Sequence, residues 1–486
     1  MKKSKMIALL LCFVMLMELS VLGVGATNGS DTEQGSDEYS YTALDNSVIN
    51  GCHTIDAQKP LLGSKKQLES AQAAFLYEVN TDTVVYAWNP DDPFPPASLV
   101  KMLTALIAIE EGNMSDIVTV TNTALAAVPE FMHGDMGLVA GEQFTLEQLI
   151  HLMMVGSSND ASAVIAEHLA GSQGGFVVKL NTRAKELGCT GSNFTDAHGL
   201  SEKNQYTTAR DMCRILREAM KSEKFMEFFA TLKYEIPATP YYATRYLATT
   251  NYLMTPGVSQ IYYDRRVTGG RTGVTNERFR SLAATSESGN LKYISIILCA
   301  VPTFAHDNYT VKRFGSYEET IELLKMAYSN MRYTEVLSED QVSTQFPVMN
   351  GENNAVAGPV TSAFTVLPAS VKLEDLEVRY EQNYASLNAP INAGDRITNI
   401  QMWYGNVCLA QTDLIAKSNV RAQGADPLIQ FHQGKKTDWT MALMILGISA
   451  GIMLLFVLGI RLVNMIQRSR RNAQYKRRSA GRRRSR

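Results

Sequence analysis

The sequence has little cysteine, histidine and charge. Its 486 residues include six cysteines and seven histidines, and only 19% of them are charged. Cys12 lies near the N-terminus; the other five are scattered and contain no C-x-x-C pair (Cys52, Cys189, Cys213, Cys299 and Cys408). No histidine belongs to an H-E-x-x-H pattern or to a close His/Cys cluster. A disulfide-stapled miniprotein is therefore excluded, most of the cysteines are expected to be small buried apolar residues, and no catalytic zinc or other cofactor is implied.

Enough apolar material is present for a folded core. Hydrophobic residues make up 45% of the chain and aromatic residues 8%, which excludes a disordered polymer and collagen. The formal net charge of -2 gives no sign of a nucleic-acid partner. By length alone, about three domains of roughly 150 residues are possible.

The N-terminal 26 residues have the three-part form of a secretory signal peptide. Three lysines precede an apolar run over residues 6–17, and Val24-Gly25-Ala26 offers small residues for cleavage after Ala26. An uncleaved anchor helix is the alternative. It is disfavoured because Glu18 interrupts the run well short of the roughly 20 residues that a membrane span needs.

Residues 439–460 are predicted to form a transmembrane helix. Met441 to Ile460 is free of charge, and twenty residues suffice for the hydrocarbon core of a bilayer. Trp439 and Arg461 mark its two edges. The tail over 461–486 contains ten arginines, Lys476 and no acid. The positive-inside rule places this tail in the cytoplasm and the preceding chain outside. A buried core helix is the weaker alternative, and contact of the tail with anionic lipid stays open.

The small net charge is therefore a cancellation between compartments. Removing the tail (+11) and the signal segment (+2) from -2 leaves -15 for residues 27–460. We expect a flexible acidic leader over 27–64, a mixed α and β domain over 65–332, a small all-β domain over 333–421, and a polar linker over 422–438.

Local patterns support an α+β fold for the larger domain. Alternating apolar residues predict a hairpin over 75–86, and two apolar runs joined at Gly289-Asn290 predict another over 280–300. Apolar spacing predicts a helix that follows Ser98 and ends at Gly112. Thr145 and Gln148 form a capping box for a helix to residue 154, and a further helix over 161–169 ends at Gly171. The economical architecture is a sheet of N- and C-terminal strands packed on a helical cluster.

The chemistry rests on three short motifs in a fixed order. A serine hydroxyl needs a base, and helical i, i+3 spacing places the amine of Lys101 beside Ser98. A lysine surrounded by apolar groups and cations has a lowered pKa and can accept a proton. Alone, S-x-x-K matches by chance and is also typical of a capped helix with a solvated lysine. Here Ser157-Ser158-Asn159 follows at a break between helices, and Arg271-Thr272-Gly273 follows just before a hairpin.

With these motifs the chain resembles the D-alanyl-D-alanine carboxypeptidases, the low-molecular-mass penicillin-binding proteins of bacteria. The resemblance covers residues 72–421 and includes the blocks 96–102, 156–161, 184–188 and 198–200 and the 387–395 segment. It implies the α+β fold of penicillin-binding proteins and β-lactamases followed by a small all-β domain. It also implies peptidoglycan stem peptides as substrates, β-lactam antibiotics as acylating inhibitors, and a bacterial cell-membrane location with the catalytic part on the wall side.

The resemblance also implies a role for each motif residue. Ser98 attacks the carbonyl between the two terminal D-alanines to form an acyl-enzyme, Lys101 is the base, and Ser157 relays a proton. The substrate-binding residues are Asn159 for the backbone amide, Arg271 and Thr272 for the terminal carboxylate, and Gly273 and Val274 beside them. The oxyanion hole is expected from the backbone N–H groups of Ser98 and Val274.

Three features depart from the family pattern. Arg271 stands where the family usually has lysine, so a planar fork replaces a point charge. The family often has a second arginine after the last hairpin, and Arg313 is the nearest candidate here, with a solvated arginine as the alternative. The anchor is a full span where relatives use an amphipathic helix. His198 is expected to be a structural histidine near the cleft.

Other functions remain open at this point. A β-lactamase is disfavoured, because Val177 stands where an E-x-x-L-N pattern needs glutamate. A DD-endopeptidase would use the same residues on crosslinked peptides. Arg271 and the diverged residues 276–279 also permit a catalytically impaired homologue that serves as a wall-binding scaffold.

Overall fold

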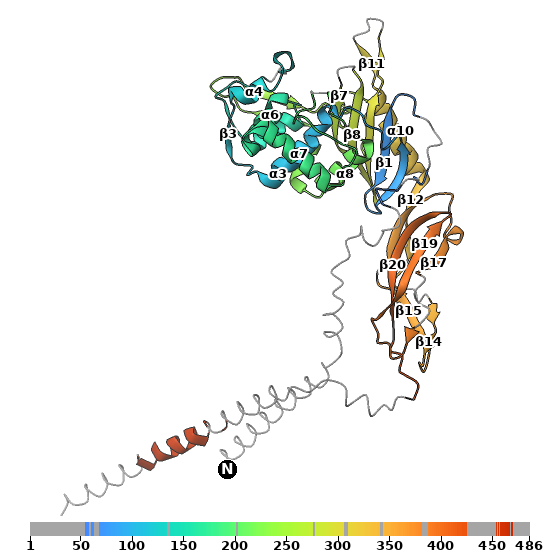
Figure 1. Ribbon diagram of the computed structural model, residues 1–486. Coiled ribbons are helices and arrows are strands. Elements are labelled where there is room, and N and C mark those ends of the chain that lie inside the picture. The colour runs from blue at the N-terminus through green and yellow to red at the C-terminus, as the bar shows by residue number, and fades with distance from the viewer. Residues whose placement is uncertain are drawn as a thin grey trace, which may run out of the picture. The chain divides into compact units, whose positions relative to one another are not determined.

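The computed structural model describes residues 54–57, 60–62, 68–133, 137–200, 203–275, 278–305, 310–340, 344–381, 387–424 and part of 453–469. Figure 1 shows the elements in chain order. The N-terminal part contains β1 (Ala73–Glu78), β2 (Thr83–Trp88), η1 (Ala97–Leu99), α3 (Val100–Glu111), β3 (Ile117–Thr119), α4 (Asn122–Ala126), η2 (Glu130–Met132), β4 (Gln143–Thr145), α5 (Leu146–Met154), α6 (Asn159–Ala170), α7 (Gln173–Glu186), α8 (Ala209–Ala219), α9 (Glu223–Ala230), β5 (Lys233–Ile236), β6 (Arg245–Ala248), η3 (Tyr252–Met254), β7 (Val267–Val274), β8 (Arg280–Ser288), β9 (Leu291–Ala300), β10 (Thr303–Phe304), β11 (Val311–Arg313) and α10 (Gly315–Asn330).

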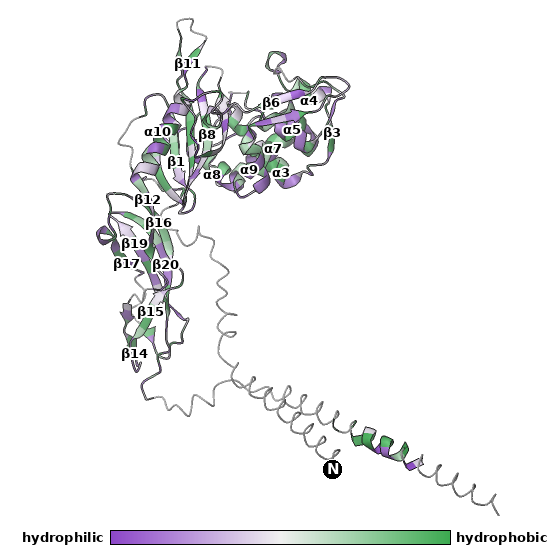
Figure 2. Cartoon of the chain, turned by 180° about the vertical axis from the view of Figure 1, so that it is seen from behind, coloured by the Kyte–Doolittle hydropathy of each residue, from purple (hydrophilic) through white to green (hydrophobic). Residues whose placement is uncertain are grey.

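The centre of this part is an antiparallel five-stranded sheet in the order β2-β1-β9-β8-β7. Both faces of β1 are buried, so its side chains enter two cores alternately. Phe75 and Tyr77 join the core shared with the helical cluster, whereas Ala74 and Leu76 join the core shared with α10. Figure 2 shows the apolar residues concentrated on these central strands. The sheet therefore forms the middle layer, and β7 is left as an edge strand.

Local sequence signals are reproduced in the structure. Thr145 and Gln148 form the predicted capping box at the start of α5. Gly171 ends α6 in the left-handed conformation, at a φ of 70°. The hairpins β1–β2 and β8–β9 lie where the alternating patterns predict them. Cys189, Cys213 and Cys299 are buried thiols, as expected, whereas Cys408 is disulfide-bonded.

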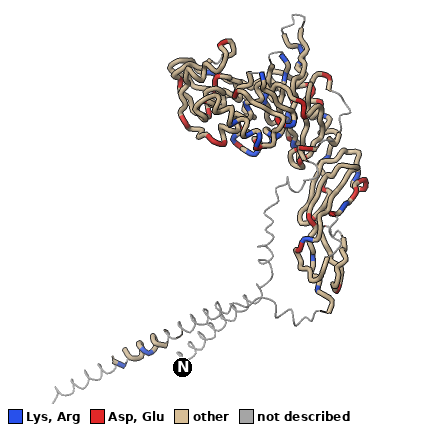
Figure 3. Tube along the Cα trace, viewed as in Figure 1, with Lys and Arg blue, Asp and Glu red and all other residues tan. Residues whose placement is uncertain are grey.

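In the residues that the structure describes between 331 and 424, the C-terminal part is all-β apart from one 3-10 turn, as predicted. Its elements are β12 (Met331–Leu337), β13 (Thr344–Phe346), β14 (Val348–Met349), β15 (Ala355–Pro359), β16 (Ala363–Pro368), η4 (Leu373–Asp375), β17 (Glu377–Tyr380), β18 (Leu387–Asn388), β19 (Arg396–Tyr404) and β20 (Val407–Ala416). Five strands form an antiparallel sheet in the order β13-β15-β20-β19-β17. Inward residues such as Leu414 and Ile400 form its separate apolar core. Acidic and basic residues are interspersed along the described chain (Figure 3).

Several predictions about the two ends lie outside the described residues. They concern the signal peptide over 1–26, most of the leader, and most of the predicted span over 439–460. Among the residues that the structure describes, no helix has both the length and the apolar character needed to cross a membrane.

Candidate active site

Three segments that are distant in sequence meet at the edge strand β7. Ser98 lies in the 3-10 turn η1, and Lys101 follows in the first turn of α3. Ser157 lies in the loop between α5 and α6, and Asn159 is the first residue of α6. The third motif, residues 271–273, lies on β7. The topology thus brings together all three motifs that the sequence singles out.

Two glycines allow other backbone segments to approach the turn that carries Ser98. A Cβ added to Gly199, whose φ is +88°, would lie 1.9 Å from the carbonyl oxygen of Ala97. A Cβ on Gly273 would lie 3.2 Å from the Cβ of Ala97 and 3.4 Å from the backbone nitrogen of Ser98. Ala97 itself has a positive φ of 46° and is buried. The nucleophile turn is therefore held in a costly conformation by close contacts on two sides.

Lys101 is fully buried, and its amine faces the second motif. The Nζ atom donates hydrogen bonds to the Ser157 carbonyl oxygen at 2.7 Å and to Asn159 Oδ1 at 2.8 Å, and it lies 3.4 Å from Ser157 Oγ. Burial, and then the charge of Arg271, hold the pKa of Lys101 well below its usual range, although Asp196 and Asp160 oppose this. Among the hydrogen bonds of the described residues, none joins Lys101 Nζ to Ser98 Oγ. The arrangement favours a neutral amine that can act as a base.

The second motif occupies the break between two helices, as its sequence predicts. Ser157 has a positive φ of 60°, which turns its side chain toward Lys101 and Arg271. Ser158 caps α6 by accepting a hydrogen bond from the backbone N–H of Ala161. Asn159 accepts from Lys101 at Oδ1 and donates a hydrogen bond from Nδ2 to the carbonyl oxygen of Met132 at 3.1 Å. The Ser158 cap and the positive φ of Ser157 together fix the position of the Ser157 hydroxyl.

Arg271 is buried and acts as a fork between segments. Its Nη2 donates to Ser157 Oγ at 2.6 Å, its Nη1 to the carbonyl oxygen of Met154 at 2.8 Å, and its Nε to the carbonyl oxygen of Ser98 at 3.3 Å. Burial lowers the pKa of Arg271 to about 10, so it remains charged at neutral pH. The guanidinium thus ties together the first motif, the second motif and the end of α5, with a geometry that lysine cannot reproduce.

Strand alternation separates the side chains of the third motif. Neighbouring residues on a strand point to opposite faces, so Arg271 and Thr272 leave β7 in different directions. The Thr272 hydroxyl shares a 2.5 Å hydrogen bond with the hydroxyl of Thr250. Thr272, Gly273 and Val274 line a pocket, whereas Arg271 is not among its lining residues.

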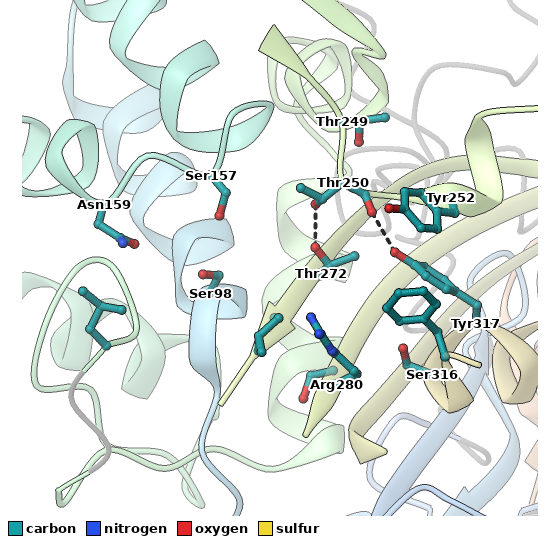
Figure 4. Close-up of a pocket in the computed structure, with 15 residues that line it drawn as sticks. Ser98, Ser157, Asn159, Thr249, Thr250, Tyr252, Thr272, Arg280, Ser316 and Tyr317 are labelled. Carbon is teal, nitrogen blue, oxygen red and sulfur yellow. Dashed lines mark hydrogen bonds between the residues drawn. The ribbon is translucent and has the colours of Figure 1, made fainter. Parts of the chain in front are cut away.

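The pocket has a volume of about 530 Å³ and opens beside Ser98 (Figure 4). Its walls are formed by all three motif segments, by the start of β8 and by the first turn of α10. The lining residues are Ser98, Ser157, Asn159, Leu200, Thr249, Thr250, Tyr252, Thr272, Gly273, Val274, Arg280, Ser281, Phe314, Ser316 and Tyr317. The phenol of Tyr317 donates a hydrogen bond to the carbonyl oxygen of Thr250 at 2.7 Å.

Arg313 lies elsewhere. Its side chain on β11 is 63% exposed and forms an ion pair of 2.6 Å with Glu318. It is not among the residues that line the pocket. This placement agrees with the alternative of a solvated arginine. His198 is buried beside the site, and its Nδ1 accepts a hydrogen bond from the backbone N–H of Leu200 at 3.3 Å.

Sequence reasoning missed Arg280, Thr250 and Tyr317, which complete the pocket wall. Arg280 is the first residue of β8 and lies opposite Val274 in the β7–β8 pairing. Thr250 precedes η3, and Tyr317 is in the first turn of α10. None belongs to a motif, and only the strand register and the packing of α10 bring them to the site. The sole signal in the sequence is the position of Arg280 a few residues beyond the third motif.

Comparisons with known proteins agree with this geometry. Residues 62–301 match the family model of the D-alanyl-D-alanine carboxypeptidases, and residues 332–422 match that of the C-terminal domain of penicillin-binding protein 5. The chain is 28% identical to D-alanyl-D-alanine carboxypeptidase DacF of Bacillus subtilis over 384 residues, which cover 76% of this chain and 90% of the relative. It is 26% identical over 406 residues to D-alanyl-D-alanine carboxypeptidase DacA of Haemophilus influenzae, covering 82% and 95%.

The fold is shared with solved structures. Penicillin-binding protein 5 of Haemophilus influenzae superposes with a TM-score of 0.58 at 25% identity, covering 74% of this chain and all of the other. Penicillin-binding protein 6B of Escherichia coli is similar in fold, with a TM-score of 0.55, 21% identity, and coverage of 75% and 100%. The segment that carries the three motifs and the C-terminal β-domain both match, and the chain therefore belongs to the D-alanyl-D-alanine carboxypeptidase family of low-molecular-mass penicillin-binding proteins.

Proposed function

We propose that this chain is a serine-type D-alanyl-D-alanine carboxypeptidase that removes the terminal D-alanine from peptidoglycan stem pentapeptides. The observation that carries the proposal is the meeting of Ser98, a buried Lys101 with a lowered pKa, and Ser157 beside one pocket. A nucleophile, a desolvated base and a second hydroxyl are the parts that acyl transfer through a serine ester needs.

In the proposed acylation, the Ser98 hydroxyl attacks the carbonyl carbon between the two terminal D-alanines. Lys101 accepts the hydroxyl proton. It is placed for this because the tight turn from η1 into α3 puts Ser98 and Lys101, three residues apart, on one side. The negative charge that develops on the carbonyl oxygen is met by the backbone N–H groups of Ser98 and Val274. Gly273 supports this assignment, since its lack of a side chain allows β7 to come close to the Ser98 nitrogen.

In the proposed second half, the departing D-alanine takes a proton through Ser157. That hydroxyl lies within reach of Lys101 and receives a hydrogen bond from Arg271, so it can pass a proton between base and leaving amine. Breaking the peptide bond leaves an ester on Ser98. Water then attacks the ester, which releases the shortened peptide and restores the Ser98 hydroxyl.

The two alternatives receive less support. A D-alanyl-D-alanine endopeptidase of Pseudomonas aeruginosa is 26% identical, but over 249 residues, or 51% of this chain. The carboxypeptidases DacF of Bacillus subtilis and DacA of Haemophilus influenzae match over 384 and 406 residues, and a match to a penicillin-binding protein β-domain extends to residue 422. For an impaired scaffold, the buried Lys101 and Arg271 would be an unexplained cost, because burying a basic side chain without an ion pair destabilises a fold.

Labelling with a fluorescent penicillin tests the proposed nucleophile. We expect the wild-type chain to form a covalent band and the Ser98→Ala variant to form none, because only Ser98 provides the hydroxyl that is acylated. The matched control is Ser316→Ala, another hydroxyl of the pocket wall, which should still be labelled. An unlabelled wild type would contradict the enzyme proposal and favour the scaffold.

We also propose that the chain is exported and held at the bacterial cell membrane by one C-terminal span, with the catalytic part on the wall side and the basic tail in the cytoplasm. The support is the residue pattern of the two ends: three lysines before an apolar run at one end, and a charge-free run before ten arginines at the other.

A further inference from the structure

The carboxylate of the substrate needs a cation in the pocket, and the third motif does not supply one there. Of the fifteen described residues that line the pocket, Arg280 alone carries a charge. Arg271, which the family pattern would use, is committed to acceptors on Ser98, Met154 and Ser157. Resting on the function proposed above, we infer that Arg280 binds the C-terminal carboxylate of the stem peptide and makes the enzyme selective for a free carboxylate.

Among the described residues, the guanidinium of Arg280 has a ring contact but no hydrogen-bond or ion-pair partner. Its Nε is buried and has no hydrogen-bond partner, and no ion pair engages the side chain among the described residues. The side chain packs over the ring of Phe314, 5.5 Å from the ring centroid, and Figure 4 shows it directed toward Thr272. Burial lowers the pKa of Arg280, because desolvation disfavours the charged guanidinium. A carboxylate would satisfy the free donors and pair the charge, in the bidentate geometry that arginine favours.

The strand register places Arg280 next to the proposed oxyanion donor. Arg280 lies directly opposite Val274 in the β7–β8 pairing, and the Val274 N–H is the proposed donor to the oxyanion. Residues that face each other across an antiparallel pair have Cβ atoms about 5 Å apart. The scissile carbonyl and the terminal carboxylate are separated by one residue, which spans at most about 3.6 Å. A peptide with its carbonyl at Val274 therefore brings its carboxylate within reach of the Arg280 side chain.

The surroundings of Arg280 suit one small anionic residue. Tyr252, Phe314 and Tyr317 contact one another through their rings and form an apolar wall on this side of the pocket. Such a wall lowers the local dielectric constant and strengthens the attraction between guanidinium and carboxylate. No carboxylate from the described chain lines the pocket and competes for the site.

The test compares two stem peptides that differ only at the C-terminus. One ends in the free carboxylate, and the other ends in a carboxamide. For the full chain, kcat/KM is measured on both, and their ratio gives the preference for the carboxylate. We expect the wild type to prefer the acid by on the order of 10- to 100-fold, as for hydrogen bonds to a charged group. In Arg280→Gln the preference should fall close to one while cleavage of the amide changes little, and Arg280→Lys should keep part of it.

Arg313→Gln provides the matched comparison, because Arg313 is the competing arginine and lies exposed outside the pocket. It should keep the wild-type preference. An unchanged preference in Arg280→Gln, or a preference lost in Arg313→Gln instead, would overturn the inference while penicillin labelling of Ser98 leaves the proposed function standing. If Arg280→Gln does not fold, Arg280→Met keeps the aliphatic stem against Phe314 and takes its place with the same two outcomes. A wild type that cleaves neither peptide and is not labelled would overturn the proposed function and the inference with it.

Discussion

The Lys101→Met variant is expected to acylate Ser98 about 10²- to 10⁴-fold more slowly than the wild type, the range that a positioned general base contributes. Methionine has a similar length and is tolerated in a buried position, so the variant removes the amine with little change in packing. It also removes the hydrogen bonds from Nζ to the carbonyl oxygen of Ser157 and to Asn159. The measurement is the second-order rate constant of penicillin acylation, followed by fluorescence.

Lys179→Met is the control for this prediction. Lys179 lies on α7, is partly exposed, and forms an ion pair with Glu111. Neither residue lines the pocket. Its loss should leave the acylation rate unchanged. A Lys101→Met variant that folds and acylates at the wild-type rate would show that another group removes the Ser98 proton.

Replacing Arg271 by glutamine is expected to lower kcat/KM by on the order of 100-fold and to move its pH dependence. The base must be neutral, so activity rises as pH increases through the pKa of Lys101. Arg271 is one of the causes that lower this pKa. Without its charge the pKa of Lys101 rises, and the acidic limb of the kcat/KM profile must move to higher pH. The loss of rate follows from the donors withdrawn from Ser98, Met154 and Ser157.

Arg271→Lys separates charge from geometry. Lysine keeps the positive charge but cannot donate to three acceptors on separate segments through a planar fork. We expect its acidic limb to stay near that of the wild type while its kcat/KM falls. If the limb of Arg271→Gln does not move, the charge of Arg271 does not tune the base.

Features determined by neighbouring residues could be predicted from the sequence. The capping box of Thr145 and Gln148, the left-handed Gly171 and the β8–β9 hairpin each depend on a few adjacent residues, and each is present. The meeting of the three motifs at one site was also predictable, because their order and spacing are specific even though S-x-x-K alone is not. The all-β character of the C-terminal part followed from short apolar runs between turn residues.

The direction of each side chain at the site could not be predicted, because it depends on strand register and packing. Arg271 carries the expected charge, yet strand alternation turns it toward Ser157 and away from the pocket lining. Arg280 enters the pocket only because β8 pairs with β7 so that it faces Val274. Arg313 fitted the family pattern by its place in the sequence, but β11 carries it to an exposed pair with Glu318. The roles of the three arginines remain predictions that the variants above can test.

Release of D-alanine from a stem pentapeptide is the most direct test of the central claim. The full wild-type chain and Ser98→Ala are incubated with the peptide, and free D-alanine and the mass of the shortened peptide are measured together. The account predicts one D-alanine for each tetrapeptide formed by the wild type, and neither product from Ser98→Ala. A wild type that is acylated by penicillin but releases no D-alanine, or a Ser98→Ala variant that releases it at the wild-type rate, would contradict it.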